Sequence, residues 1–245
     1  VVDLELVLAV DVSLSMDFEE QRLQRDGYVA ALRDPQVIAA IKAGHHGRIA
    51  ISYMEWAGPY SQETVLHWTI IDGEETAEAV ARKLEEAPIS RKRMTSISSA
   101  LEYAGKLLES NPYRGFRRVI DISGDGPNNS GPPVTPIRDE LVNKGIVING
   151  LPIFIRPSQS SLFDISYLDR YYADCVIGGP GSFMIPIRDK SEFATATRQK
   201  LLLEISALPP PPQLIPVQFV NEDEKTNCLI GEQLWRRYMD ERIRN

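Results

Sequence analysis

Residues Leu4–Met16 place a buried strand directly before a run of oxygen-bearing side chains. Every residue from Leu6 to Val10 is apolar, and the apolar run ends at Asp11. A continuous apolar run of this kind is typical of a strand covered on both faces, as parallel strands in α/β sheets are. Oxygen-bearing side chains then follow at alternate positions: Asp11, Ser13, Ser15 and Asp17. The sequence therefore puts a carboxylate and hydroxyls where a buried strand emerges, which is where open α/β sheets bind their ligands.

Size and charge narrow the classes of partner. The chain has 245 residues, enough for one large domain with a small appendage, and a formal net charge of −7. Nucleic-acid binding calls for clustered Lys and Arg, so we expect no nucleic-acid partner. No apolar run approaches the roughly 20 residues that a membrane-spanning helix needs, so we expect no membrane span.

The order of the segments predicts a doubly wound α/β domain. After the first strand, further strands are expected at 48–56, 64–71, 118–123 and 146–155, with a last one inside 175–187. Helices are expected at 17–43 with an interruption at Asp34–Pro35, and at 74–86, 98–109, 137–143, 165–172 and 190–207. The strands on either side of Gly58–Pro59 suit a hairpin. We predict a mainly parallel six-stranded sheet with one antiparallel edge strand and helices on both faces.

The C-terminal part of the chain differs in composition. Four consecutive prolines at 209–212 predict a stiff polyproline linker that ends a domain covering residues 1–208. The remaining residues, 213–245, contain an apolar stretch at 214–220 and a helix-like segment at 232–243. We expect this extension to pack back on the domain, with Cys228 as an anchor.

Two cysteines leave two interpretations open. Cys175 and Cys228 can form a disulfide in an oxidising compartment or remain two separate thiols, and neither is flanked by metal-type spacing. We favour the disulfide. The chain opens at Val1 without a methionine, so we expect a mature or trimmed chain from which any leader has been removed.

Three polar loops stand out, each at the end of a strand or just before a helix. They carry Asp11, Ser13 and Ser15 in the first, Thr95 in the second and Asp125 in the third. Taken singly, such residues commonly cap helices or form turns. Taken together, two carboxylates and three hydroxyls make a hard, all-oxygen ligand set that suits Mg²⁺, Mn²⁺ or Ca²⁺ and disfavours Zn²⁺ or Cu²⁺.

The three loops resemble the metal-ion-dependent adhesion site (MIDAS) of the von Willebrand factor type A (VWA) domain. The family pattern is D-x-S-x-S, then a Thr before a helix, then an Asp after the next strand, usually followed by Gly. Asp11, Ser13, Ser15, Thr95 and Asp125 fill these positions in order. The resemblance covers about residues 2–207, and one departure is Met94, where the family often has Gly. The wording of the segments EWAG, RRVIDISGDGPNN and CVIGGPG is similar to a bacterial branch with exported members, which implies a periplasmic or extracellular location.

The resemblance implies a metal-dependent protein-binding module. Ser13, Ser15 and Thr95 would bind the metal through hydroxyls, while Asp11 and Asp125 would act directly or through water. An acidic residue of a partner protein would then complete the coordination of the cation. Two alternatives stay open: a Mg²⁺-dependent hydrolase or phosphotransferase with Asp11 as nucleophile, and a VWA subunit of a chelatase or AAA⁺ assembly. A phosphotransferase would place a second carboxylate two residues after the first, where this chain has Ser13, and no Walker-type loop is present.

Other polar residues near these loops have simpler interpretations. Asp121 lies four residues before Asp125, about 13 Å along an extended strand, so we expect a buried, satisfied carboxylate and not a metal ligand. Asp17 suits a helix N-cap. Asn128–Ser130 matches a glycosylation acceptor, but a loop beside a metal explains it better. Arg91–Arg93 is a short basic run, either solvated or in contact with an acidic partner.

Overall fold

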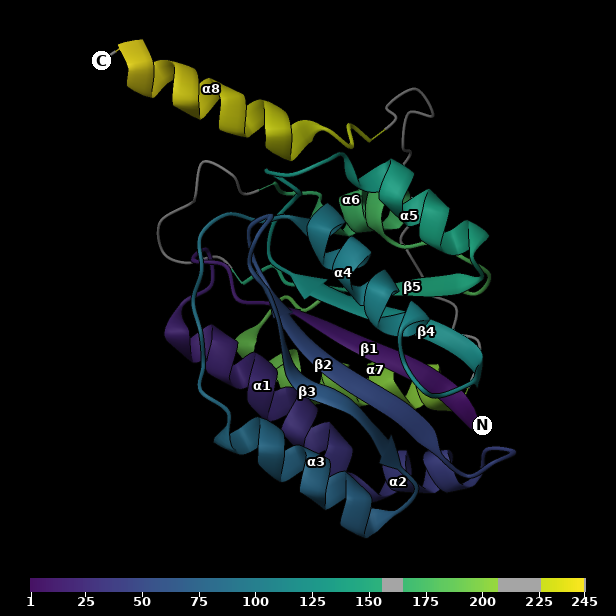
Figure 1. Cartoon of the computed structure of the whole chain (residues 1–245). Coiled ribbons are helices and arrows are strands. Elements are labelled where there is room, and N and C mark those ends of the chain that lie inside the picture. The colour runs from purple at the N-terminus through teal and green to yellow at the C-terminus, as the bar shows by residue number, and fades with distance from the viewer. Residues whose placement is uncertain (156–164, 207–225, 245) are drawn as a thin grey trace, which may run out of the picture.

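Five strands form one sheet in the order β3-β2-β1-β4-β5, with β1 at its centre (Figure 1). The structure is a computed structural model, and it describes residues 1–155, 165–206 and 226–244. β1 is parallel to β2 and β4, β4 is parallel to β5, and β3 is antiparallel to β2 at the edge. The strands are β1 Val2–Asp11, β2 Ile49–Trp56, β3 Gln62–Ile71, β4 Gly115–Gly124 and β5 Ile146–Pro152. The predicted fold class and the antiparallel edge strand are confirmed.

Helices cover both faces of this sheet (Figure 1). α1, α2, α3 and α7 pack on one face, and α4, α5 and α6 on the other. The helices are α1 Phe18–Arg33, α2 Pro35–Lys42, α3 Glu74–Glu86, α4 Ile97–Glu109, α5 Val134–Asn143, α6 Leu168–Tyr171, α7 Phe193–Ser206 and α8 Ile230–Arg244. Short turns of π-helix (Tyr172–Val176) and 3₁₀-helix (Lys190–Glu192) follow α6 and precede α7.

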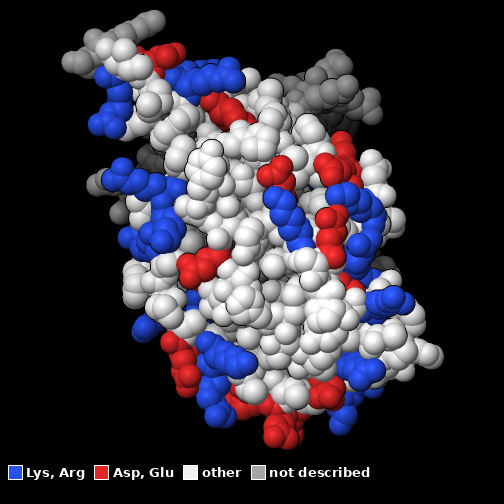
Figure 2. All heavy atoms as spheres, viewed as in Figure 1, with Lys and Arg blue, Asp and Glu red and all other residues white. Residues whose placement is uncertain are grey.

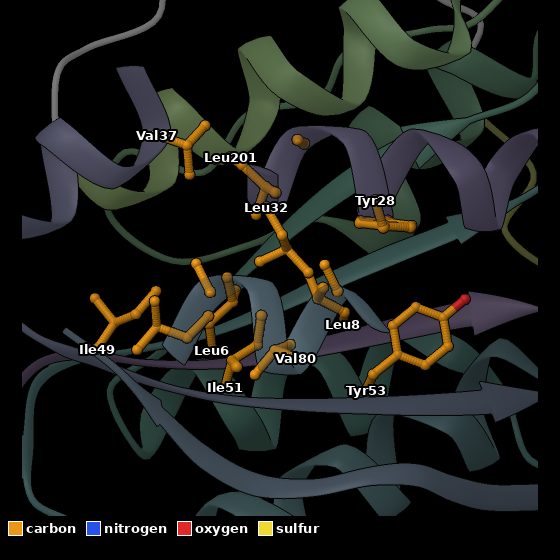
Figure 3. Close-up of a cluster of buried hydrophobic side chains, with 14 of the residues drawn as sticks. Leu6, Leu8, Tyr28, Leu32, Val37, Ile49, Ile51, Tyr53, Val80 and Leu201 are labelled. Atoms are coloured by element: carbon orange, nitrogen blue, oxygen red, sulfur yellow. The ribbon is translucent and has the colours of Figure 1, made fainter. Parts of the chain in front are cut away.

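The central strand supplies both halves of the core. Leu4, Leu6 and Leu8 point into the cluster beneath α1, α3 and α7, which Figure 3 shows in part. Val7 and Ala9 point into the opposite cluster, against α4 and β4. Side chains alternate between the faces of a strand, so a strand segment covered on both sides should be apolar at successive positions, as Leu6–Val10 of β1 are. Full burial of each Leu or Val contributes about 1.5–3 kcal/mol.

Local capping explains where the first helices begin and end. Asp17 accepts a hydrogen bond from the Glu20 amide, and the Glu20 carboxylate accepts one from the Asp17 amide, which is the expected capping box. Pro35 has no amide hydrogen to continue α1, so α1 ends at Arg33. Asp34 then caps α2, whose first residue is Pro35.

The predicted sixth strand is wrong for the residues described. The segment 175–187 begins inside the π-helix and then makes isolated bridges to β5 and its continuation, antiparallel at Gly178 and parallel at Met184 and Ile187. Gly179 and Gly181 have φ of 94° and 74°, which turns the chain out of an extended conformation. The helical region predicted at 165–172 is also shifted, because its π-helical turn runs on to Val176.

The C-terminal helix is tied to the body by a disulfide and then leads away from it (Figure 1). The predicted disulfide between Cys175 and Cys228 is confirmed. The predicted linker at 209–212 and the apolar stretch at 214–220 lie outside the described residues, so the domain boundaries stay predictions. Across the described parts of the chain, no helix combines the length and the apolar character needed to cross a membrane.

Candidate metal centre

Side chains of the first and third loops meet at the carboxyl edge of the sheet. The Ser13 and Ser15 hydroxyls lie 2.7 Å apart, and the Ser15 hydroxyl donates to Asp125 Oδ1 at 2.7 Å. β1 and β4 are neighbouring parallel strands, so the loops that follow them emerge side by side. Residues 110 positions apart thus form one continuous array of oxygen atoms.

Asp11 lies beneath this array as a fully buried carboxylate. Its Oδ1 accepts a hydrogen bond from the Ser13 amide at 2.7 Å, while Oδ2 is buried without a hydrogen-bond partner among the described residues. Burial raises the pKa of Asp11 to about 7, against the opposing effect of hydrogen bonds from Ser13 and the Asp125 amide. A buried carboxylate needs a positive charge or a proton, so the open oxygen fits a cation.

The second loop joins the other two through its backbone. Lys92 donates its amide to the Val12 carbonyl at 2.9 Å, which attaches this loop to the first. The Thr95 amide donates to Asn129 Oδ1, and the Asn129 amide donates to the Thr95 carbonyl, both at 2.9 Å. The buried Thr95 is therefore held against the loop that carries Asp125.

Met94 has the left-handed φ of 71° that glycine adopts without strain. This is the position at which the sequence departs from the VWA pattern, and its backbone has a conformation that suits the glycine which that pattern often has there. Gly58 in the hairpin turn makes room for the loop, because a Cβ there would lie 2.8 Å from the Arg93 carbonyl oxygen and 3.3 Å from Met94 Cβ.

Several residues that hold these loops were not singled out by their spacing. Gln24 and Gln21 of α1 are buried and donate to the Asp11 and Ser13 carbonyls at 3.1 and 3.2 Å. Arg91 donates to the Leu14 and Met16 carbonyls at 3.1 and 2.7 Å. The signal available in the sequence was the spacing of Gln21 and Gln24, which lie three residues apart on the helix expected after the motif and so share one of its faces.

The basic run and the asparagines have distinct roles. Arg91, Lys92 and Arg93 are exposed, and Figure 2 shows Lys and Arg side chains along the left-hand edge, where Figure 1 places the loop between α3 and α4.

Asn128 is fully buried, and its side chain forms hydrogen bonds with Ser98, Pro132 and Glu232. A glycan cannot attach to this side chain in the folded protein, which leaves the structural interpretation of the asparagines.

Asp121 belongs to a separate buried cluster, as predicted. The Lys200 amine of α7 lies 2.7 Å from Asp121 Oδ1 and also pairs with Glu204. Tyr28 donates weakly to Asp121 Oδ2 at 3.4 Å. No set of three or more Asp, Glu, His or Cys side chains within the described ranges is arranged to hold a metal, so the candidate centre depends on its hydroxyls.

One family model covers most of the chain. The family model described as "Protein of unknown function (DUF1194)" matches residues 1–209. The chain belongs to the DUF1194 family. No curated protein matches the chain in sequence.

Solved structures show that this DUF1194 chain has the VWA fold. A von Willebrand factor type A structure from Catenulispora acidiphila is 13% identical, with a TM-score of 0.58, over 83% of this chain and 43% of that one. Proximal thread matrix protein 1 of the mussel byssus, "with zinc occupied MIDAS motif", is 14% identical, with a TM-score of 0.62, over 84% and 48%. An aerotolerance-related membrane protein from Bacteroides fragilis is 19% identical, with a TM-score of 0.55, over 84% and 100%. The chain thus spans less than half the length of the first two proteins.

Proposed function

We propose that this protein is a metal-dependent protein-interaction module. The observation that carries the proposal is the hydrogen-bonded array of Ser13, Ser15 and Asp125 next to the buried, open Oδ2 of Asp11. Hydroxyls and carboxylates of this kind suit a hard divalent cation, Mg²⁺ or else Mn²⁺ or Ca²⁺. The zinc-occupied MIDAS of the mussel protein supports divalent binding on this fold in general.

Each residue of the set would have a defined part. Ser13, Ser15 and Thr95 would offer hydroxyl ligands, and Asp11 and Asp125 would neutralise charge directly or through water. A bound cation would supply positive charge and a coordination position that an outside carboxylate can fill. Mg²⁺ has six coordination positions and usually keeps water in several of them beside one or two protein carboxylates. Two carboxylates and three neutral hydroxyls therefore leave at least one position that an outside ligand can occupy. We therefore expect the partner to present an Asp or Glu.

The disulfide supports an oxidising compartment. Cys175 and Cys228 are bonded, and disulfides persist mainly in oxidising environments. We propose that the protein acts after export, in the periplasm or outside the cell. A cytosolic assembly with an AAA⁺ ATPase would expose this bond to reducing conditions.

Metal binding is the first test. Isothermal titration with Mg²⁺ and with Mn²⁺ should detect a single site in the native protein and none in Asp11→Asn, which keeps the side-chain shape but removes the charge. Asp26→Asn, an exposed carboxylate of α1, is the matched control and should bind as the native protein does. Equal metal affinity in Asp11→Asn would reject the site.

Partner capture is the second step. Protein from the native source that is retained with Mg²⁺, released by EDTA and not retained by Asp11→Asn would support a metal-bridged contact. Retention that neither EDTA nor the Asp11→Asn substitution reduces would contradict it. Turnover of a generic phosphate ester that vanishes in Asp11→Asn would instead favour a hydrolase.

A further inference from the structure

The start of the C-terminal helix packs directly on the loop that carries Asp125. Gly231 lies so close to Asn128 that a Cβ on it would come within 2.0 Å of the Asn128 carbonyl oxygen. The next residue, Glu232, accepts a hydrogen bond from Asn128 Nδ2 at 2.8 Å through its Oε1. A residue 104 positions further along the chain thus contacts the third loop of the candidate metal centre.

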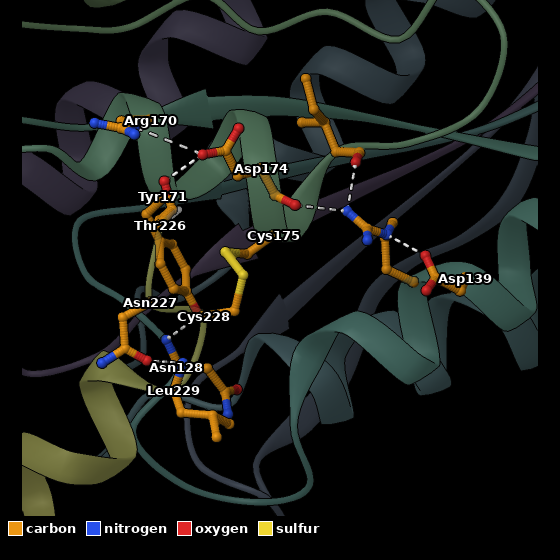
Figure 4. Close-up of a disulfide and its surroundings, with 12 residues drawn as sticks. Asn128, Asp139, Arg170, Tyr171, Asp174, Cys175, Thr226, Asn227, Cys228 and Leu229 are labelled. Atoms are coloured by element: carbon orange, nitrogen blue, oxygen red, sulfur yellow. Dashed lines mark hydrogen bonds and ion pairs between the residues drawn. A yellow bond between two sulfur atoms is a disulfide. The ribbon is translucent and has the colours of Figure 1, made fainter. Parts of the chain in front are cut away.

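The disulfide holds this segment in place (Figure 4). Cys228 bonds Cys175 of the π-helix, with the two Cα atoms 5.6 Å apart. Thr226 hydrogen-bonds Asp174 on the same turn. Tyr171, one turn earlier, accepts the Asn128 amide on its hydroxyl at 3.2 Å. α6, through Tyr171, and the C-terminal segment, through Glu232, therefore both hydrogen-bond Asn128.

Asn128 also contacts the segment that follows Thr95. Its Oδ1 accepts from the Ser98 amide and hydroxyl at the start of α4, both at 3.2 Å. Its neighbour Asn129 clamps Thr95 by the two 2.9 Å bonds described above. The loops that contribute Thr95 and Asp125 are thereby joined through one asparagine pair. The side-chain amide of Asn128 donates to the Pro132 carbonyl at 3.2 Å and to Glu232 at 2.8 Å.

We propose that Glu232 and the Cys175–Cys228 disulfide are positioning elements of the metal centre, so that the docked C-terminal segment raises the affinity of the site for its cation. This inference rests on the proposed function and extends it to residues outside the D-x-S-x-S pattern. The physical reason is that a ligand set made mostly of neutral hydroxyls gains little from charge alone. Its affinity depends on how well Thr95 and Asp125 are held before the metal arrives, and residues that orient ligands in this way affect metal affinity by about 10–100-fold.

The test compares two substitutions at one position. Glu232→Ala removes the nearer of the two acceptors of Asn128 Nδ2 and leaves only the Pro132 carbonyl, so it should raise the Kd for Mg²⁺ about 10-fold. Glu232→Gln keeps a carbonyl oxygen there and should leave the Kd near that of the native protein. Glu241→Ala, an exposed acid further along α8, removes the same charge without touching the loop and should have no effect. The Cys175→Ser/Cys228→Ser double variant should weaken Mg²⁺ binding at least as much as Glu232→Ala.

A second measurement separates positioning from general destabilisation. Hydrogen exchange of the metal-free protein, well below its melting temperature, should show faster exchange at the Thr95 amide in Glu232→Ala and in the double serine variant, with unchanged protection in β1 and β2. Native protein that binds no Mg²⁺ would overturn the proposed function and this inference together. Native protein that binds Mg²⁺, with an unchanged Kd in Glu232→Ala and the double variant, would overturn this inference alone.

Discussion

Two buried carboxylates on neighbouring strands have opposite surroundings. Asp121 of β4 is 2.7 Å from the Lys200 amine, deep under α7. Asp11, at the end of β1, has an Oδ2 with no hydrogen-bond partner and no lysine or arginine ion pair among the described residues. The described residues thus supply a cationic partner for Asp121 and none for Asp11.

The two carboxylates differ in whether the fold gives them a cationic partner, and this difference predicts how variants of each region behave. A buried charge is costly unless it is paired or neutralised. For Asp121 that need is met inside the fold by Lys200, which also pairs with Glu204, and the cluster ties α7 to the sheet. Around Asp11 the neighbours are hydroxyls and amide groups, which orient the carboxylate without neutralising it. Variants of the two regions should therefore behave in opposite ways.

The largest effect is expected from Lys200→Met. This change leaves two carboxyl groups buried without their cation, and removing one partner of a buried pair costs about 3–5 kcal/mol of the free energy of unfolding. Urea denaturation followed by circular dichroism measures the loss. Lys190→Met, at a surface lysine paired with Glu19, is the control and should leave the free energy of unfolding nearly unchanged, because exposed ion pairs contribute little. A small loss for Lys200→Met would remove the contrast between the two regions.

A smaller effect, of opposite sign, is expected when the counter-charge of Asp11 is added. Mg²⁺ at 100 times its Kd should stabilise the native protein by about 2.7 kcal/mol, because it binds only the folded state. For a chain of this length that corresponds to a rise of roughly 5–10 °C in the melting temperature. Asp11→Asn should lose this response and be at least as stable as the native protein without metal. A full Mg²⁺ response in Asp11→Asn would show that the cation binds elsewhere.

The smallest effect concerns pH. Burial, together with the charge of Asp121, raises the pKa of Glu204 from 4.5 to about 7, since one lysine cannot neutralise two carboxylates. The folded state therefore keeps a proton that the unfolded state loses above pH 4.5, so stability falls as the pH rises through 7. We expect a loss of about 2 kcal/mol between pH 5 and pH 8. Glu204→Gln should make this part of the stability profile shallower, and the remaining slope should come from Asp11, whose pKa burial also raises to about 7. An unchanged slope would contradict the contribution of Glu204.

Most of the fold could be predicted because its elements have strong local patterns. The apolar run of β1, the capping box at Asp17 and the break at Asp34–Pro35 all depend on residues close together in sequence. The prediction of a strand inside 175–187 was wrong for a local reason as well. Its apolar residues suit a strand, but positive φ at Gly179 and Gly181 prevents continuous pairing with β5.

The sequence by itself determined the order and spacing of the oxygen-bearing side chains proposed as ligands, and that at least two of the three segments follow buried strands. Only the tertiary structure decided that Ser15 reaches Asp125, that Lys200 serves Asp121 and not Asp11, and that Glu232 contacts Asn128. The physical reason is range. Periodicity and capping act over a few residues, whereas contacts between residues some 80 to 110 positions apart depend on strand order and on which helix lies over which face.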